Sequence, residues 1–144
     1  MTKFFLAVHV IAAILAVGPV AVAASMFPPA ARRAASTSDL AVVRALHRIC
    51  RVYALVGISV PVFGFATAGS LGVTGDPWLV TSIVLTALAA VVLVVFVLPL
   101  QRAFLAETAT SALGGLAMHT GVFNLLWAVV TVLMIVRPGS TTSA

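Results

Sequence analysis

Three histidines and one asparagine are the side chains of this chain most able to support binding chemistry in apolar surroundings. His9, His119 and Asn124 each fall inside a long apolar stretch, whereas His47 lies among arginines. Polar groups inside a membrane are costly, so each of them is a functional candidate. Because imidazole nitrogens ligate metals and haem iron, His9, His47 and His119 are candidate ligands of a metal or of haem b. Asn124 is expected to hydrogen-bond across helices.

The positions of the histidines restrict which of them can share a ligand. If the apolar stretches cross a membrane as helices, His9 and His119 are separated by roughly 15 Å along the membrane normal. One haem cannot take both as axial ligands. His47 and His119 lie near the same side and form the better pair. The alternative is structural: His9 hydrogen-bonds a neighbouring helix, and His47 and His119 pack or reach toward the headgroups.

Other kinds of site find no support in the residues. Apart from Lys3 at the start of the first, the four apolar stretches hold no Asp, Glu, Lys or Arg, which disfavours a proton relay, an ion site and a voltage sensor. The chain has no Ser, His and Asp constellation, no phosphate-binding glycine loop and no Cys and His cluster. Its single cysteine, Cys50, excludes an intrachain disulfide. Enzyme activity would therefore need a bound cofactor or a partner, and a non-enzymatic role is favoured.

Composition shows which elements must position these residues. The chain is 62% hydrophobic and 8% charged, whereas a soluble domain is about a quarter charged. A membrane-spanning helix needs roughly 20 mostly apolar residues. Four segments qualify, residues 3–27, 52–70, 78–99 and 115–136. The sequence predicts an all-α membrane protein in which residues 1–144 form one domain, a bundle of four transmembrane helices.

The basic residues predict how the bundle is oriented. Five arginines lie between the first two spans: Arg32, Arg33, Arg44, Arg48 and Arg51. Arg102 lies in the third loop, on the same side, and the other side has only Lys3 and Arg137. The positive-inside rule places the arginines in the cytoplasm and both termini outside. The net charge of +5 is thus a topology signal rather than a sign of nucleic-acid binding. Few lysines and abundant alanine and valine are typical of GC-rich bacteria, which indicates a bacterial cytoplasmic membrane.

The first apolar segment could instead be a secretory signal peptide. Lys3 precedes the apolar stretch, and Ala21, Val22 and Ala23 form an A-x-A site. The stretch is longer than the usual 7 to 15 residues, however, and a signal peptide would require the opposite arginine placement. A retained transmembrane helix is the favoured interpretation.

Loop residues support these boundaries. Glycines precede Asp76 and Pro77 in a short turn, where Asp76 can cap a helix that begins at Pro77. On the other side, Ser38 is a plausible N-cap for a cytoplasmic helix extension over residues 39–51. All five arginines between the first two spans are expected to contact anionic lipid headgroups. Residues 138–144 are predicted to be a disordered tail.

Small residues recur along three of the spans and predict where the helices pack. Lipid gives helices no hydrophobic drive to associate, so interfaces use small residues that admit close backbone approach. The lines are Ala12, Ala16, Pro19 and Ala23 in the first span; Ala54, Gly57, Pro61, Gly64 and Ala68 in the second; and Ala117, Gly121, Asn124, Ala128 and Thr131 in the fourth. We expect all three lines to face the bundle interior and Pro61 to kink its helix.

These residues resemble a known family. The first helix opens with His9, Val10, Ile11, Ala12 and Ala13 and its run ends near Gly18, Trp78 opens the third helix, and Leu133 to Pro138 close the fourth. In this the chain is similar, over nearly its whole length, to the bacterial domain-of-unknown-function family 2269, which has no assigned activity. The His9 segment also resembles the first helices of copper-resistance membrane proteins and of a membrane-bound protoporphyrinogen oxidase. That resemblance implies a ligand role for His9, although the matched histidines and basic residues are missing.

The leading functional hypothesis is a small non-enzymatic accessory or scaffolding subunit of a larger inner-membrane complex. Its partners would be other membrane subunits or copies of itself, with no nucleic acid. The alternative is a haem- or metal-binding membrane redox protein that uses His9 or the pair His47 and His119. A small-solute transporter has only Asn124 and Pro61 in its favour.

Overall fold

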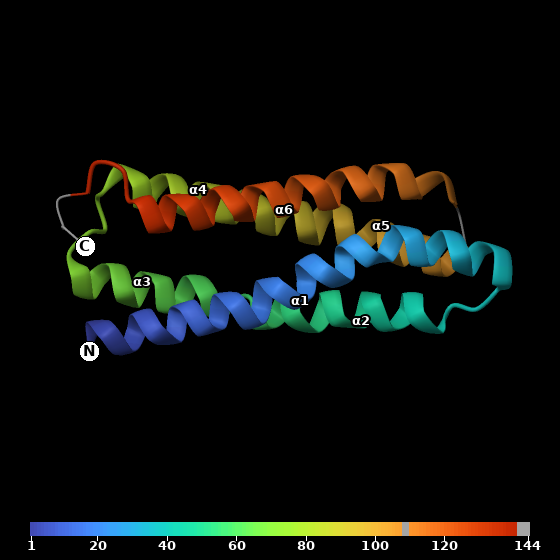
Figure 1. The fold of residues 1–144 in the computed structure, drawn as a ribbon, viewed down its shortest axis with the longest axis horizontal. Helices are drawn as coiled ribbons and strands as arrows, with labels where there is room; N and C mark the ends of the chain where they lie inside the picture. Colours follow the sequence, from blue (N-terminus) through green and yellow to red (C-terminus); the bar gives the residue numbers. More distant parts are fainter. Residues whose placement is uncertain (108–109, 141–144) are drawn as a thin grey trace.

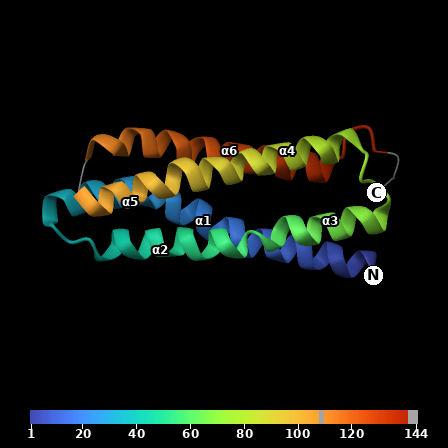
Figure 2. The ribbon, with the colours of Figure 1, turned by 180° about the vertical axis from the view of Figure 1, so that it is seen from behind.

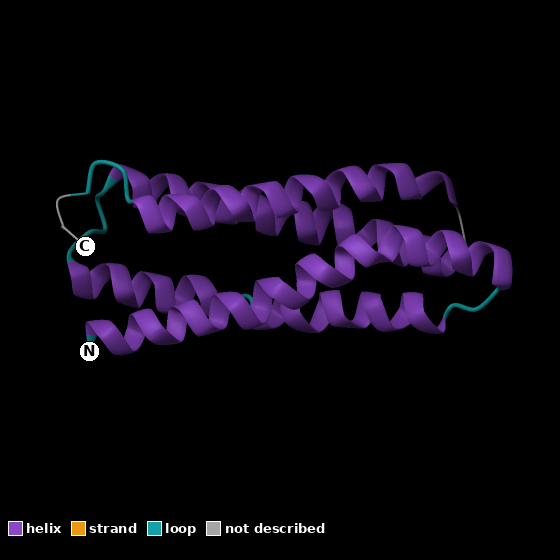
Figure 3. Cartoon of the chain, in the orientation of Figure 1, coloured by secondary structure: helices purple, strands orange, loops and turns teal. Residues whose placement is uncertain are grey.

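The computed structural model describes residues 1–107 and 110–140, and these residues form helices and short connections without a strand (Figure 3). The helices are α1 (Thr2–Thr37), α2 (Ala41–Val56), α3 (Ser59–Leu71), α4 (Pro77–Val91), the π-helix η1 (Val92–Val97), α5 (Leu98–Glu107), the 3-10 helix η2 (Thr110–Ala112) and α6 (Leu113–Val136). They join into four rods, each long and apolar enough to cross a membrane.

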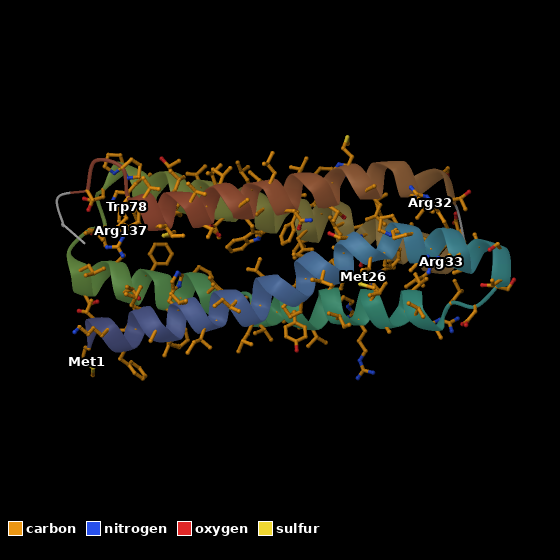
Figure 4. All side chains as sticks on the ribbon, in the orientation of Figure 1. Met1, Met26, Arg32, Arg33, Trp78 and Arg137 are labelled. Carbon is orange, nitrogen blue, oxygen red and sulfur yellow. The ribbon has the colours of Figure 1, made fainter. Side chains whose placement is uncertain are left out.

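The four rods lie side by side in an elongated bundle (Figure 1). Seen from behind, α4 and α5 form one continuous rod that runs along the rod of α2 and α3 (Figure 2). The two ends of the bundle differ. We call the end with Met1, Trp78 and Arg137 the terminal end, and the end with Arg32 and Arg33 the arginine end (Figure 4).

Two prolines explain the irregular turns within the rods. Pro61 has no N–H to donate to the Gly57 carbonyl, which accepts a bond of 3.1 Å from Val60 instead, so α2 and α3 are separate helices. Pro99 likewise cannot donate to the Val95 carbonyl, and the chain widens into a π-helix immediately before it. The rod then continues to Glu107, beyond the predicted end of the third span at residue 99.

Helix ends also differ from the sequence prediction. Ser38 does not cap α2: it has a left-handed backbone (φ 59°) and ends α1, while α2 begins at Ala41. Asp39 takes over the capping contact, since its Oδ1 accepts the Ala41 N–H at 3.0 Å. Asp76 precedes α4 as predicted, but its carboxylate accepts a hydrogen bond from Trp78 Nε1 at 3.0 Å rather than from the helix backbone.

The core occupies mainly the arginine half of the bundle. Phe27 of α1 and Phe104 of α5 are fully buried there and meet edge to face, with ring centroids 6.0 Å apart. Leu116 of α6 and Val43 of α2 belong to the same cluster, so all four rods contribute to it. A smaller cluster at the terminal end joins Ala68, Val73, Trp78 and Leu79.

The small-residue line of the first span faces the bundle interior, whereas the small-residue line of the fourth span does not. Ala16 and Ala23 of α1 are buried, as expected for an interior line. In α6, by contrast, Ala117, Gly121 and Ala128 are exposed, which corrects the prediction that this line faces the bundle interior. Since α6 is apolar on all sides, its sequence contains no amphipathic signal for its rotation.

Part of the predicted disordered tail lies within the described residues. The Ser140 N–H donates to the Arg137 carbonyl at 3.0 Å, so the chain turns after α6. Residues 141–144 lie outside the described residues.

Candidate functional site

His9 joins α1 to α3. Its Nδ1–H donates to the Val60 carbonyl at 2.8 Å, because a carbonyl oxygen can only accept. The ring lies directly against Gly64, where an added Cβ would come within 2.9 Å of His9 Cε1. Gly64 thus allows the two helices to approach closely. His9 makes the hydrogen bond to a neighbouring helix that was expected if its role is structural.

His47 belongs to a buried polar chain between α2 and α5. Its Nδ1–H donates to Gln101 Oε1 at 2.9 Å, and Gln101 Nε2 donates to Cys50 Sγ at 3.5 Å. Gln101 and Cys50 are fully buried, and His47 is 9% exposed. Gln101 lies beyond the predicted third span and was therefore not predicted as a site residue. Its one signal in the sequence is a carboxamide side chain close behind an apolar stretch.

His119 lies in different surroundings. Its Nδ1–H donates to the Gly115 carbonyl of its own helix at 2.6 Å, and its ring stacks on Phe96 at a centroid distance of 4.7 Å. Phe96 is 41% exposed on the third rod, whereas Gln101, the partner of His47, is fully buried on that rod. His47 and His119 therefore contact different residues of the third rod, one buried and one exposed.

The three histidines do not belong to a cluster of ligating side chains within the described residues. Among residues 1–107 and 110–140, no group of three or more His, Cys, Asp or Glu side chains could hold a metal ion. Each imidazole keeps Nε2 available, but His9, His47 and His119 have separate neighbours. The two best-formed cavities measure about 270 and 310 Å³. Ligand pockets range from about 300 to 1,000 Å³, so one cavity is at the small end of that range and the other is just below it.

The first cavity is a groove between α1 and α6 that is open on one side. We call it the α1–α6 groove; it is lined by Ser25, Pro28, Pro29, Arg32, Ala117, Thr120, Gly121 and Asn124. Asn124 Nδ2 donates to Ser25 Oγ at 3.0 Å across it. Thr120 Oγ1 and Asn124 Oδ1 are buried and have no hydrogen-bond partner. A buried polar atom without a hydrogen-bond partner destabilises the fold relative to one that is hydrogen-bonded.

The second cavity combines cationic and apolar residues. We call it the arginine groove; it is lined by Arg44, His47, Arg48, Arg51, Val52 and Leu55 of the second rod and Leu105 of α5. The three arginines are exposed, and none of the described residues that line the groove is acidic. Arg32 and Arg33, the other two predicted headgroup contacts, are also exposed and lie at the arginine end (Figure 4).

The predicted packing residues have three different environments. Gly64 separates two helices, as described above. Gly57 lies at the break beside Pro61, where an added Cβ would be 3.1 Å from the Ala54 carbonyl oxygen of the preceding turn, so its constraint is local. Gly121 has no atom within 4 Å of an added Cβ and therefore packs against nothing within the described residues.

Comparison of the chain with protein-family models, with curated proteins and with solved structures found no match.

Proposed function

We propose that this protein is a small non-enzymatic accessory or scaffolding subunit of a larger membrane assembly, and that its α1–α6 groove docks a transmembrane helix of another subunit. The supporting observation is the outward-facing small-residue line of α6. Ala117, Gly121 and Ala128 are exposed, and the space above Gly121 is open. Small residues on a transmembrane helix favour close approach of a second helix.

The unpartnered polar atoms of the groove support the same proposal. Thr120 is 3% exposed, yet its hydroxyl has no hydrogen-bond partner. The Asn124 Oδ1 atom is also buried without a hydrogen-bond partner. Water is scarce at membrane depth, so these atoms need a protein partner. Ser, Thr and Asn side chains of an incoming helix would satisfy them, as interhelical hydrogen bonds do in membrane bundles.

The proposed location is a bacterial cytoplasmic membrane, with both termini on the outer side. Met1 and Arg137 lie at the terminal end, opposite Arg32 and Arg33 (Figure 4). The positive-inside rule supports a cytoplasmic arginine end. An impermeant maleimide should label a Gly139→Cys variant in intact cells and leave a Thr37→Cys variant unlabelled; the reverse result would overturn the orientation.

The experiment that tests the subunit proposal compares two glycine variants. A tagged copy is recovered from native membranes in mild detergent, and proteins that copurify in stoichiometric amount are identified by mass spectrometry. Gly121→Leu fills the groove and should abolish recovery of the partner. Gly18→Leu is the matched control, since Gly18 also has no neighbour within 4 Å but does not line the groove. Gly64 is unsuitable because it contacts His9 within the chain.

Equal recovery of the partner with Gly121→Leu and Gly18→Leu would overturn the docking face. Recovery of the chain alone or only with its own copies would overturn the accessory role. The rival proposal, a haem- or metal-binding redox protein, has one supporting observation: each histidine donates Nδ1–H and spares Nε2, as ligating histidines do. A Soret band after expression with adequate haem, or stoichiometric metal by elemental analysis, would support that rival.

A further inference from the structure

We propose that the arginine groove is a binding site for a phospholipid whose headgroup carries two negative charges. The inference concerns a different surface from the α1–α6 groove and does not depend on the proposed function.

The cationic part of the groove calls for an anion. Arg44, Arg48 and Arg51 are spaced four and three residues apart on α2, so they share one helix face. None of the described residues that line the groove is acidic, and like charges at this spacing repel one another. Guanidinium groups bind phosphate oxygens in a bidentate manner. Three of them together favour a ligand with more than one negative charge.

The apolar part of the groove indicates a lipid rather than a soluble anion. Val52 and Leu55 continue the face of the three arginines along the same rod, and they are 48% and 70% exposed. Leu105 of α5 forms the facing wall. A lipid would bind with its phosphate next to the arginines and its acyl chains along Val52, Leu55 and Leu105. This arrangement matches the headgroup-to-tail direction of a lipid in a bilayer. Basic pockets between transmembrane helices bind doubly charged lipids in this way.

The buried polar chain fixes the shape of the groove. His47 lines the groove while its Nδ1–H is held by Gln101, so Nε2 is the ring nitrogen left for a ligand. Gln101 lies on α5, as does Leu105, and therefore ties the two walls together. A site held on two helices in this way is organised before the ligand binds. The α1–α6 groove, in contrast, offers a single cation, Arg32.

The test measures lipid binding to the purified full-length protein in detergent by native mass spectrometry. The probes are cardiolipin, with two phosphates, phosphatidylglycerol, with one, and phosphatidylcholine, with no net charge. Cardiolipin should bind saturably and tightest. Phosphatidylglycerol binding as tightly as cardiolipin would overturn the preference for two charges. Displacement of cardiolipin by excess inorganic pyrophosphate would overturn the assignment to a lipid.

Two double variants separate the groove from general charge attraction. Arg44→Gln with Arg48→Gln should weaken cardiolipin binding about tenfold or more, because charge-assisted contacts are lost. Arg33→Gln with Arg102→Gln removes the same two charges from a net charge of +5 but lies outside the groove, and should change binding less than about threefold. All four side chains are exposed, and far-ultraviolet circular dichroism verifies folding. Equal loss in both double variants would overturn the proposed site.

Discussion

The two halves of the bundle are built differently. In the arginine half, all four rods meet around the fully buried Phe27, Phe104 and Leu116. In the terminal half, the rods associate mainly in pairs, α1 with α3 and α4 with α6, and among the described elements α3 makes extensive contacts with α1 alone (Figure 1). Large interlocking side chains thus hold one half, whereas a close backbone approach and a few specific contacts hold the other.

The difference follows from the kind of residue available in each half. Lipid tails are as apolar as the core, so burial alone does not drive helices together. Van der Waals packing and hydrogen bonds between helices determine how strongly they associate. Phe104 fills space among four rods. Gly64 provides no side chain of its own but admits the His9 ring, which then reaches Val60. The following variants separate these two ways of holding helices, from the largest expected effect to the smallest.

Phe104→Ala should destabilise the protein most. Removal of a fully buried ring that contacts Phe27 leaves a cavity in the only place where four rods meet within the described residues, and such changes cost about 3 to 5 kcal/mol. The free energy of unfolding in detergent measures the loss. Phe65→Ala is the control, since Phe65 is 56% exposed, and it should have little effect. Equal losses would show that the arginine half does not hold the fold.

Gln101→Leu should cost about 1 to 3 kcal/mol of unfolding free energy. It leaves the His47 N–H without its acceptor in a buried position. Adding His47→Leu should restore part of the loss, because a pair of apolar residues leaves no buried donor unsatisfied. Additive losses in the double variant would contradict a coupled pair.

Gly64→Ala should cost about 1 to 2 kcal/mol, and the loss should be confined to the terminal half. The new Cβ would come within 2.9 Å of the His9 ring, which must move away from the Val60 carbonyl. Gly69→Ala meets open space and serves as the control. Hydrogen exchange of α1 and α3 amides localises the change. Similar exchange in the two variants would mean that His9 does not join these helices.

Arg137→Gln should have the smallest effect, about 0.5 to 1 kcal/mol. The half-buried Arg137 places its guanidinium over the buried Trp78 ring at 5.6 Å, in a cation–π contact at the terminal end. Tryptophan fluorescence should shift while the unfolding free energy changes little. Arg137→Lys keeps the charge and should retain most of the contact; a full loss in that variant would indicate a role other than the ring contact.

The candidate site could be predicted only in part. His9, Asn124 and Arg48 were recognised because a polar group in or beside an apolar stretch is conspicuous in sequence. Their partners were not recognised. Gln101 and Ser25 are ordinary residues near a boundary or inside an alanine-rich run, and each acquires its role only from a residue far away in the chain. His47 and His119 likewise have partners that the sequence did not indicate, Gln101 and Phe96, because similar depth does not mean a shared face.

Length, hydropathy and charge placement determined four helices able to cross a membrane and an arginine-rich end, because these are local properties of a segment. The tertiary structure decided how each helix is rotated about its axis. It turned the small-residue line of α6 outward, separated the three histidines, and brought Gln101 between His47 and Cys50. A helix that is apolar on all sides can present any face to its neighbours, so contacts between segments distant in sequence make that choice.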